Sequence, residues 1–167
     1  MHSIGLLGSI FSRNWFHAPA LALWTDAASL RAWVDAEVAL AQAQAELGLI
    51  PADAARTIAA RLHDMAFDDA RLVADIAHTM HPFVPVLRQL EERCGEPAAA
   101  WLHWGATTQN IVDTGMALQL ERSHALLLDG IDRSLRGLAR LAHDYRDAPM
   151  AGRTHGQHAL PITFGFK

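Results

Sequence analysis

Apolar residues recur along most of the chain at the three- and four-residue spacing of α-helices, most clearly between Thr25 and Leu47. The apolar stripe of this stretch consists of Leu30, Val34, Val38, Ala41 and Ala45. Thr25 or Asp26 suits the start of the helix, and Gly48 with Pro51 beyond it suits the end. We find no alternation of apolar and polar residues convincing enough to predict a strand. The pattern therefore predicts an all-α fold.

Three shorter helices are predicted next, over about residues 51–62, 68–77 and 81–94. Ile58 and Leu62 lie on one side of the first, and Asp68 or Asp69 can cap the second. Pro82 suits the first turn of the third, and Gly95 suits its end. These four helices form the first predicted domain, residues 1–106.

A much longer helix is predicted from Thr107 or Thr108 to about Tyr145, since this stretch holds no proline and no cluster of turn residues. At 1.5 Å per residue it would span roughly 57 Å. Its apolar positions include Ile111, Leu118, Leu127, Ile131, Leu135, Leu138 and Leu141. A domain of this size cannot cover such a helix, so we expect residues 107–167 to begin a bundle of long helices that is incomplete here.

The last apolar run, Leu160–Phe166, has a proline near its start and is interpreted as the opening of another helix. Because a chain that stopped there would expose an unfinished apolar element, we expect the sequence to be the N-terminal portion of a longer protein.

Composition narrows the class of protein. The 167 residues are 51% hydrophobic and 19% charged, with a net charge of -4 and no basic run, which argues against nucleic-acid binding. Met1–Leu7 lacks the pattern of a signal peptide, and no apolar run reaches membrane-spanning length. Cys94 is the only cysteine, so no internal disulfide can form. We expect a cytoplasmic protein without nucleic-acid or membrane partners.

The first polar cluster, His103–Asn110, lies at the entrance to the long helix. Its members Thr107, Thr108, Gln109 and Asn110 would surround backbone N–H groups that have no partner within the helix. Partial positive charge at a helix start favours a carboxylate or phosphate there. The alternative is that one threonine merely caps the helix.

The second polar cluster is Gly152–Pro161. Arg153 can bind a carboxylate with its planar fork, and His155 can exchange a proton near neutral pH. Thr154 and Gln157 add hydrogen-bonding groups, although an ordinary polar turn is the alternative. His78 and His81 have a spacing that could suit a metal, but no further ligand lies nearby in the sequence, so we expect no metal and no cofactor.

Together the two clusters resemble signature regions of the fumarase/aspartase superfamily of lyases. The chain is similar to the N-terminal part of the subgroup that contains adenylosuccinate lyase and 3-carboxy-cis,cis-muconate cycloisomerase. The matching segments are Leu23–Asp26, Arg31–Glu37, Glu46–Pro51, His103–Thr114 and Gly152–Gly165.

This resemblance implies an all-α chain with a small N-terminal domain and a central bundle of very long helices. It implies a homotetramer whose active sites take residues from three subunits, and a small dicarboxylate-type substrate. The implied reaction is a reversible anti β-elimination that releases fumarate by C–N or C–O cleavage, or the related cyclisation.

The resemblance also implies roles for individual residues. His155 corresponds to the general acid, and Thr107 with Thr108 to a pair that binds carboxylate. The other substrate-binding positions are Gln109, Asn110, Arg153, Thr154, Gln157 and His81. The family's third signature, a Ser-Ser-x-Met-Pro loop that carries the catalytic base, has no counterpart in these residues.

Two departures from the subgroup concern the substrate. Ile4–Phe11 holds no Arg-Tyr pair of the kind that grips the nucleotide phosphate in adenylosuccinate lyases. Bacterial cycloisomerases commonly have tryptophan at the position of His155, which favours an elimination with a histidine acid. Cycloisomerisation stays an alternative, and so does a non-catalytic helical fragment that only oligomerises.

Overall fold

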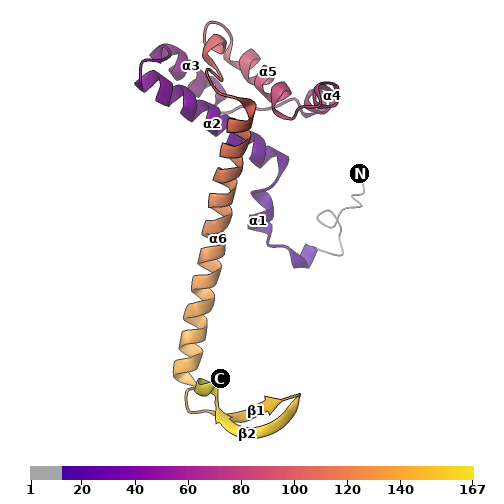
Figure 1. The fold of residues 1–167 in the computed structure, drawn as a ribbon, viewed down its shortest axis with the longest axis vertical. Helices are drawn as coiled ribbons and strands as arrows, with labels where there is room; N and C mark the ends of the chain where they lie inside the picture. The colour runs from indigo at the N-terminus through magenta and orange to yellow at the C-terminus, as the bar shows by residue number, and fades with distance from the viewer. Residues whose placement is uncertain (1–12) are drawn as a thin grey trace. The chain divides into compact units, whose positions relative to one another are not determined.

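The computed structural model describes residues 13–167, and the predictions about Met1–Leu7 and Ile4–Phe11 lie outside them. The chain divides into two compact units at Ser123 and His124. The boundary that we predict between residues 106 and 107 stays a prediction. Each unit is described by itself, and one helix, α6, runs through both (Figure 1).

The first unit is entirely helical in its described part. Thr25 and Asp68 cap helices α2 and α4, their side chains accepting hydrogen bonds from the N–H groups of Ala28 at 3.2 Å and Arg71 at 3.0 Å. The elements are η2 (Arg13–Trp15), α1 (Ala18–Ala22), α2 (Asp26–Glu46), α3 (Ala52–Leu62), α4 (Asp69–Thr79), α5 (Phe83–Cys94), η3 (Ala99–Trp101) and the start of α6 (Thr108–Asp144). The helices predicted for this unit are confirmed, whereas the short α1 and the 3-10 helices η2 and η3 were not predicted.

The hydrophobic core of the first unit lies between α2, α3, α5 and the start of α6. Ile58, Leu62, Phe83 and Leu90 are completely buried, and the ring of Trp33 meets Phe83 edge-on with 5.6 Å between centroids. Burial of each such side chain contributes about 1.5–3 kcal/mol. The first unit is therefore stabilised by a hydrophobic core of its own.

The first turns of α6 complete this core. Ile111, Gly115 and Gln119 are its buried residues, at a spacing that faces one side of the helix. Gly115 lies so close to the indole of Trp33 that a Cβ added to it would be only 2.4 Å from the Trp33 Cδ1. The close approach of α2 and α6 thus depends on a glycine.

The second unit holds the rest of α6 and a β-hairpin. Strands β1 (Pro149–Thr154) and β2 (Gln157–Thr163) pair antiparallel, followed by η4 (Phe164–Phe166). The helix expected to open at Leu160 is therefore wrong. The all-α class nevertheless holds, since residues 13–167 form six α-helices and only one small two-stranded sheet.

The hairpin forms because its turn suits two strands. His155 and Gly156 both have positive φ, 49° and 74°, as the two central residues of a type I′ turn require. The register shifts at Gly152 and Arg153, where β2 carries an extra residue, and a Cβ on Gly152 would come within 2.9 Å of the Leu160 oxygen. Glycines in the turn and at the bulge therefore outweigh the apolar, proline-led run that suggests a helix.

The strands return the chain to the end of α6. The N–H of Phe164 donates to the Ala148 oxygen at 2.9 Å, and the ring of Phe164 packs edge-on against Tyr145. Gly165 donates to the Arg146 oxygen at 3.1 Å, and a Cβ there would lie 2.7 Å from that oxygen.

None of the helices between residues 13 and 167 is long and apolar enough to span a membrane.

Candidate functional site

The first candidate region is the start of α6. The backbone N–H of Thr107 donates to the Asn110 side-chain oxygen at 3.1 Å, and the Asn110 N–H donates to the Thr107 oxygen at 2.9 Å. Asn110 thus closes the helix start from its third position, as in half of a capping box. The Asn110 N–H is bound to the Thr107 backbone oxygen and not to the Thr107 hydroxyl. This hydroxyl therefore has no hydrogen bond among the described residues, and Thr107 is exposed to solvent.

Gln109 is exposed at the same helix start, and its amide donates to Asp113 at 2.7 Å. The second N–H of this amide is left to donate to a ligand. The N–H groups of Thr108 and Gln109 find no partner within residues 13–167 and add partial positive charge. The arrangement suits an anion.

His81 lies against this helix start. Its Nδ1 accepts from the backbone N–H groups of Phe83 and Val84, each at 3.2 Å, so the neutral ring carries its proton on Nε2. That nitrogen lies 3.3 Å from the Thr108 hydroxyl oxygen and donates to it. The Thr108 hydroxyl is thereby left to donate its own proton to a ligand.

The structure adds a pair that sequence reasoning did not place in the site. His103, at φ 57°, points its Nδ1 at the buried carboxyl of Glu37, with 2.6 Å between Nδ1 and Oε1. Burial raises the pKa of the Glu37 carboxyl, and the hydrogen bond with His103 lowers it in part. The sequence did hold a signal for this pair: Glu37 follows Val34 by three positions and so lies on the apolar face of α2, where a charged residue is unexpected.

The second candidate region lies on the hairpin of the second unit. His155 occupies the turn at its tip, flanked by the paired residues Thr154 and Gln157. Arg153 precedes them on β1, and all four side chains are exposed. The hairpin therefore presents an imidazole at its turn between two neutral hydrogen-bonding groups, with an exposed guanidinium one residue earlier on β1.

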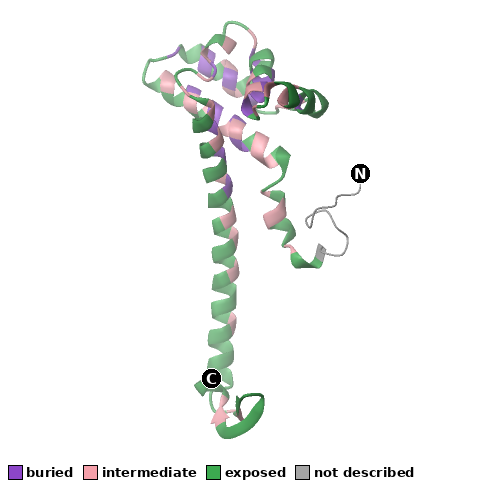
Figure 2. Ribbon diagram, turned by 45° about the vertical axis from the view of Figure 1, so that its right-hand side comes forward, coloured by how far each residue is buried: buried purple, intermediate pink, exposed green. Residues whose placement is uncertain are grey.

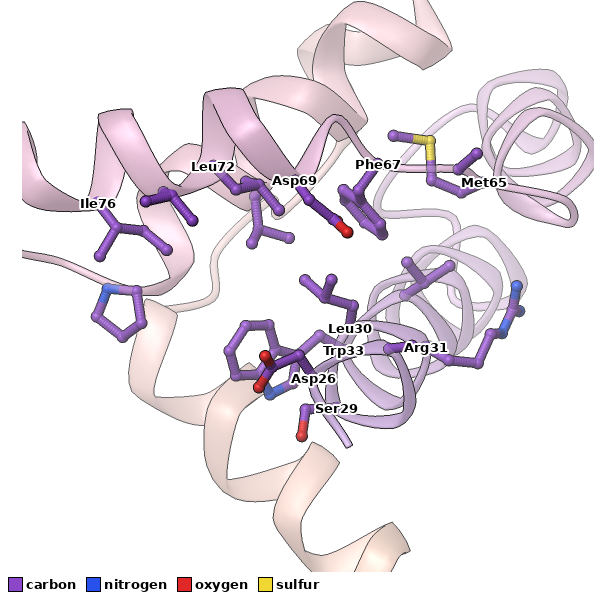
Figure 3. Close-up of a pocket in the computed structure, with 16 residues that line it drawn as sticks. Asp26, Ser29, Leu30, Arg31, Trp33, Met65, Phe67, Asp69, Leu72 and Ile76 are labelled. Carbon is purple, nitrogen blue, oxygen red and sulfur yellow. The ribbon is translucent and has the colours of Figure 1, made fainter. Parts of the chain in front are cut away.

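A cavity of about 680 Å³ lies between α2, α4 and α5 in the first unit (Figure 3). Its walls are mainly apolar, and none of the predicted site residues lines it. Asp26 and Asp69 border it, while Arg31 is bound to Asp35 and to the backbone oxygens of residues 62 and 63. Two carboxylates without a free cation disfavour a dicarboxylate, so this cavity is no candidate for the substrate site.

Two other kinds of chemistry find little support. Over the described part of the chain, no three His, Cys, Asp or Glu side chains come together as metal ligands. Burial raises the pKa of Cys94 to about 11, so the thiol stays protonated at neutral pH and is a poor nucleophile.

The structure thus has exposed hydrogen-bond donors at the start of a long helix in one unit and an exposed imidazole at a hairpin turn in the other. Comparison with known proteins gives the family. The family model described as Lyase matches residues 17–167, which include both candidate regions. The chain belongs to this family, within the fumarate lyase superfamily.

Curated relatives carry several activities in their names. Over 117 residues the chain is 41% identical to N-acetyl-S-(2-succino)cysteine lyase of Enterococcus italicus. It is 42% identical over 118 residues to adenylosuccinate lyase of Methanothermobacter thermautotrophicus, and 35% identical over 120 residues to 3-carboxy-cis,cis-muconate cycloisomerase of Pseudomonas aeruginosa. Each alignment covers 70% of this chain and 26% of the relative, so the chain spans about a quarter of the length of these relatives.

A solved structure agrees with this family. Fumarate lyase from Mesorhizobium sp. BNC1 matches with a TM-score of 0.86 and 43% identity, over 95% of this chain and 37% of that one.

Proposed function

We propose that this chain is part of a lyase that eliminates fumarate from a succinyl group bound to nitrogen, oxygen or sulfur. The family match over both candidate regions supports this proposal most directly. The name of the Enterococcus italicus relative describes a succinyl group on sulfur, and adenylosuccinate carries one on nitrogen. A succinyl group attached to a heteroatom is the feature that these substrates share.

The proposed reaction is an anti β-elimination. A base removes a proton from the carbon next to one carboxylate, and the electron pair forms the new C=C bond as the C–heteroatom bond breaks. The leaving heteroatom takes a proton from an acid, and fumarate remains. Two groups therefore need preorganised partners: the carboxylate that holds developing negative charge, and the leaving atom.

The start of α6 is proposed to hold the substrate carboxylate. The Thr107 hydroxyl is free, and the Thr108 hydroxyl can donate outward because His81 already donates to it. The Asn110 side-chain NH2 and the second N–H of the Gln109 amide remain available to donate at the same helix start. These groups stabilise an anion by hydrogen bonds and by the helix dipole.

The hairpin is proposed to supply the acid. His155 stands at the tip of a tight turn, where its imidazole can approach a substrate, with Thr154 and Gln157 beside it to bind. Arg153 offers a bidentate partner for a second carboxylate. In the resemblance drawn above the base is a serine of a Ser-Ser-x-Met-Pro loop, and these 167 residues contain no such sequence.

Assembly is part of the same proposal. From the resemblance drawn above we expect a homotetramer in the cytoplasm whose active sites combine residues of several subunits. The leucines of α6 that are exposed along the second unit support self-association. A helical fragment that oligomerises without catalysis is the alternative that these leucines also fit. Cycloisomerisation is the second candidate reaction, favoured by the Pseudomonas aeruginosa relative.

The test is substrate turnover by the complete protein that carries this chain. Fumarate release is measured with N-acetyl-S-(2-succino)cysteine and with adenylosuccinate as substrates. For the cycloisomerase alternative, lactone formation from 3-carboxymuconate is measured. His155→Ala is expected to lower kcat about 10²–10⁴-fold while substrate binding changes little, as for loss of a general acid. His63→Ala is the matched control, since the His63 side chain is 78% exposed and lies in neither candidate region.

A second arm tests the carboxylate site. Replacing Thr107 and Thr108 together by valine is expected to weaken inhibition by fumarate by roughly 3–6 kcal/mol, the loss of two hydrogen bonds to a charged group. Unchanged inhibition in a folded variant would reduce both residues to helix caps. Turnover that survives His155→Ala intact would remove the proposed acid.

A further inference from the structure

Glu37 is a carboxyl group in the middle of a hydrophobic core. Its side chain is completely buried on α2, the helix that also contributes Val34 and Ala41 to the core. Oε1 meets Nδ1 of His103 at 2.6 Å, whereas Oε2 is buried without any hydrogen-bond partner in the described structure. Because a buried, half-satisfied carboxyl destabilises a fold, a leucine would serve the core better. The role of the Glu37 carboxyl is therefore its contact with His103 and not stabilisation of the core.

The pair determines which nitrogen of His103 carries hydrogen. Because Glu37 is completely buried and its Oε2 has no hydrogen-bond partner in the described structure, a bare carboxylate is disfavoured there and the pair favours keeping a proton; burial raises the pKa of Glu37 accordingly. That proton resides either on Nδ1, which gives an imidazolium, or on Glu37, which then donates to Nδ1. In both arrangements Nε2 bears a hydrogen. The outer nitrogen of His103 is therefore a hydrogen-bond donor.

Nε2 of His103 is open to a ligand. It makes no hydrogen bond within residues 13–167, and it is not among the atoms that are buried without a partner. The ring is held on its other side by Phe83, with 5.5 Å between centroids. The backbone N–H of Phe83 donates to His81, so both histidines contact this residue, His103 at its ring and His81 at its backbone.

The same turn carries the proposed carboxylate site. The His103 oxygen accepts from the Ala106 N–H at 3.3 Å, directly before Thr107. One further side chain of α2 secures the turn: Gln44, two helical turns beyond Glu37 on the same face, donates to the Trp104 oxygen at 2.6 Å. Two polar residues of α2 thus hold the segment that leads into α6.

We propose that Glu37 is a positioning residue, which holds His103 so that its Nε2–H donates to the anionic substrate beside Thr107 and Thr108. This inference rests on the proposed lyase function, whose substrate carries two carboxylates. His103 makes the contact with substrate, and Glu37 acts through it.

The test is a double-mutant cycle in the complete protein with the succinyl substrate that it turns over. His103→Ala removes one hydrogen bond to a charged group and is expected to raise KM about 10- to 100-fold. Glu37→Leu should raise KM by a similar factor, with a smaller effect on kcat than on KM. The double variant Glu37→Leu with His103→Ala should have the same KM as His103→Ala alone. Glu37→Gln should recover most of the loss, because its amide can donate to Nδ1 and leave Nε2 protonated.

Gln89→Leu is the matched control for lost stability. Gln89 is also buried and polar, and it exchanges hydrogen bonds with the backbone of Asp68 at 3.0 and 3.2 Å, away from the proposed site. We expect this variant to lower the melting temperature without changing KM. A KM change in this control equal to that of Glu37→Leu would show that general destabilisation accounts for both, and would overturn the proposal.

A second measurement does not depend on activity. Long-range ¹H–¹⁵N spectra of protein labelled with ¹⁵N-histidine report which ring nitrogen bears hydrogen. The His103 Nε2 should be protonated in the wild type at neutral pH, and Glu37→Leu should shift the signal towards a mixture of tautomers. A bare Nε2 in the wild type would overturn the proposal whether or not the substrate is known.

The kinetic outcomes separate the two proposals. If no succinyl compound is a substrate, the lyase proposal fails and the spectra still decide the role of Glu37. If the enzyme is active but the effects of Glu37→Leu and His103→Ala add in the double variant, Glu37 does not act through His103. If Glu37→Leu fails to fold, Glu37→Gln and the wild-type spectra carry the test.

Discussion

Helix α6 belongs to two regions that differ in burial. Its first turns, up to Ser123, bury Ile111, Gly115 and Gln119 against the core of the first unit. From His124 to Lys167 no residue is buried, as Figure 2 shows by its colours. The exposed apolar residues of this second region include Leu127, Leu128, Ile131, Leu135, Leu138, Leu141, Leu160 and Phe166.

This difference separates two sources of order. The first unit is stabilised by its own hydrophobic core, in which Ile58, Phe83 and Leu90 are fully buried. The second unit has a helix and a hairpin but no such core, and an isolated helix gains little from propensity alone. Exposed leucines on a regular helix indicate a surface that other helices cover. Four predictions test this contrast.

The largest effect is expected from charges on the exposed face of α6. Leu128 and Leu135, two helical turns apart, are 50% and 60% exposed. Replacing both by glutamate should weaken self-association by about 3–6 kcal/mol, or roughly 10²–10⁴-fold, since burying each leucine contributes about 1.5–3 kcal/mol. Analytical ultracentrifugation measures this, with Leu47→Glu and Leu49→Glu as exposed controls in the first unit. A wild-type chain that stays a folded monomer at micromolar concentration would contradict the idea.

The next effect contrasts one core residue with one exposed residue. Phe83→Ala should lower the free energy of unfolding by about 3–5 kcal/mol, because the side chain is fully buried and leaves a cavity. Leu135→Ala in the monomeric chain should change it by no more than about 0.5 kcal/mol. Chemical denaturation followed by circular dichroism measures both, and equal losses would refute the contrast.

Two glycines of α6 give opposite expectations. Gly115→Ala should destabilise by about 1–3 kcal/mol, because the new Cβ would meet Trp33 at 2.4 Å. Gly137 has nothing within 4 Å of an added Cβ, so Gly137→Ala should stabilise the monomeric chain by up to about 1 kcal/mol through helix propensity. Thermal melts of the two variants provide the comparison. Destabilisation by Gly137→Ala would indicate that another chain already packs against this position.

The smallest effect concerns pH. Burial raises the pKa of Glu37 above 4.5, with a further contribution from Glu91 and partial opposition from His103. The unfolded chain therefore releases this proton at lower pH than the folded chain does, and stability falls as pH rises from about 4.5 towards the raised pKa. The slope is at most about 1.4 kcal/mol per pH unit. Denaturation of the wild type and Glu37→Gln at several pH values should show a steeper fall in the wild type, and the difference between the two slopes measures the contribution of Glu37.

Local signals predicted most of the helices. Thr25 and Asp68 cap α2 and α4 as expected, and the predicted long helix corresponds to α6, Thr108–Asp144. These features depend on neighbours in the sequence: a side chain that accepts from an N–H three residues on, or apolar residues spaced by helical turns. The polar cluster at residues 107–110 was located for the same reason, since a helix start exposes its N–H groups wherever it occurs.

The hairpin was not predicted, because the evidence for it is spread over two strands. An apolar run such as Leu160–Phe166 suits a helix or a strand equally by its period. The positive φ of His155 and Gly156, and the close approach of Gly152 to Leu160, select the strand. These are properties of a folded pair rather than of either segment.

The sequence by itself determined the helical class, most helix bounds, the family and the candidate residues at the start of α6 and around His155, because each follows from local chemistry or from a contiguous motif. Only the tertiary structure brought Glu37 to His103, 66 positions away, and His81 to Thr108, 27 positions away. It also decided which part of α6 is buried. Contacts between residues far apart in the chain form only when the helices pack, so their partners cannot be read from spacing.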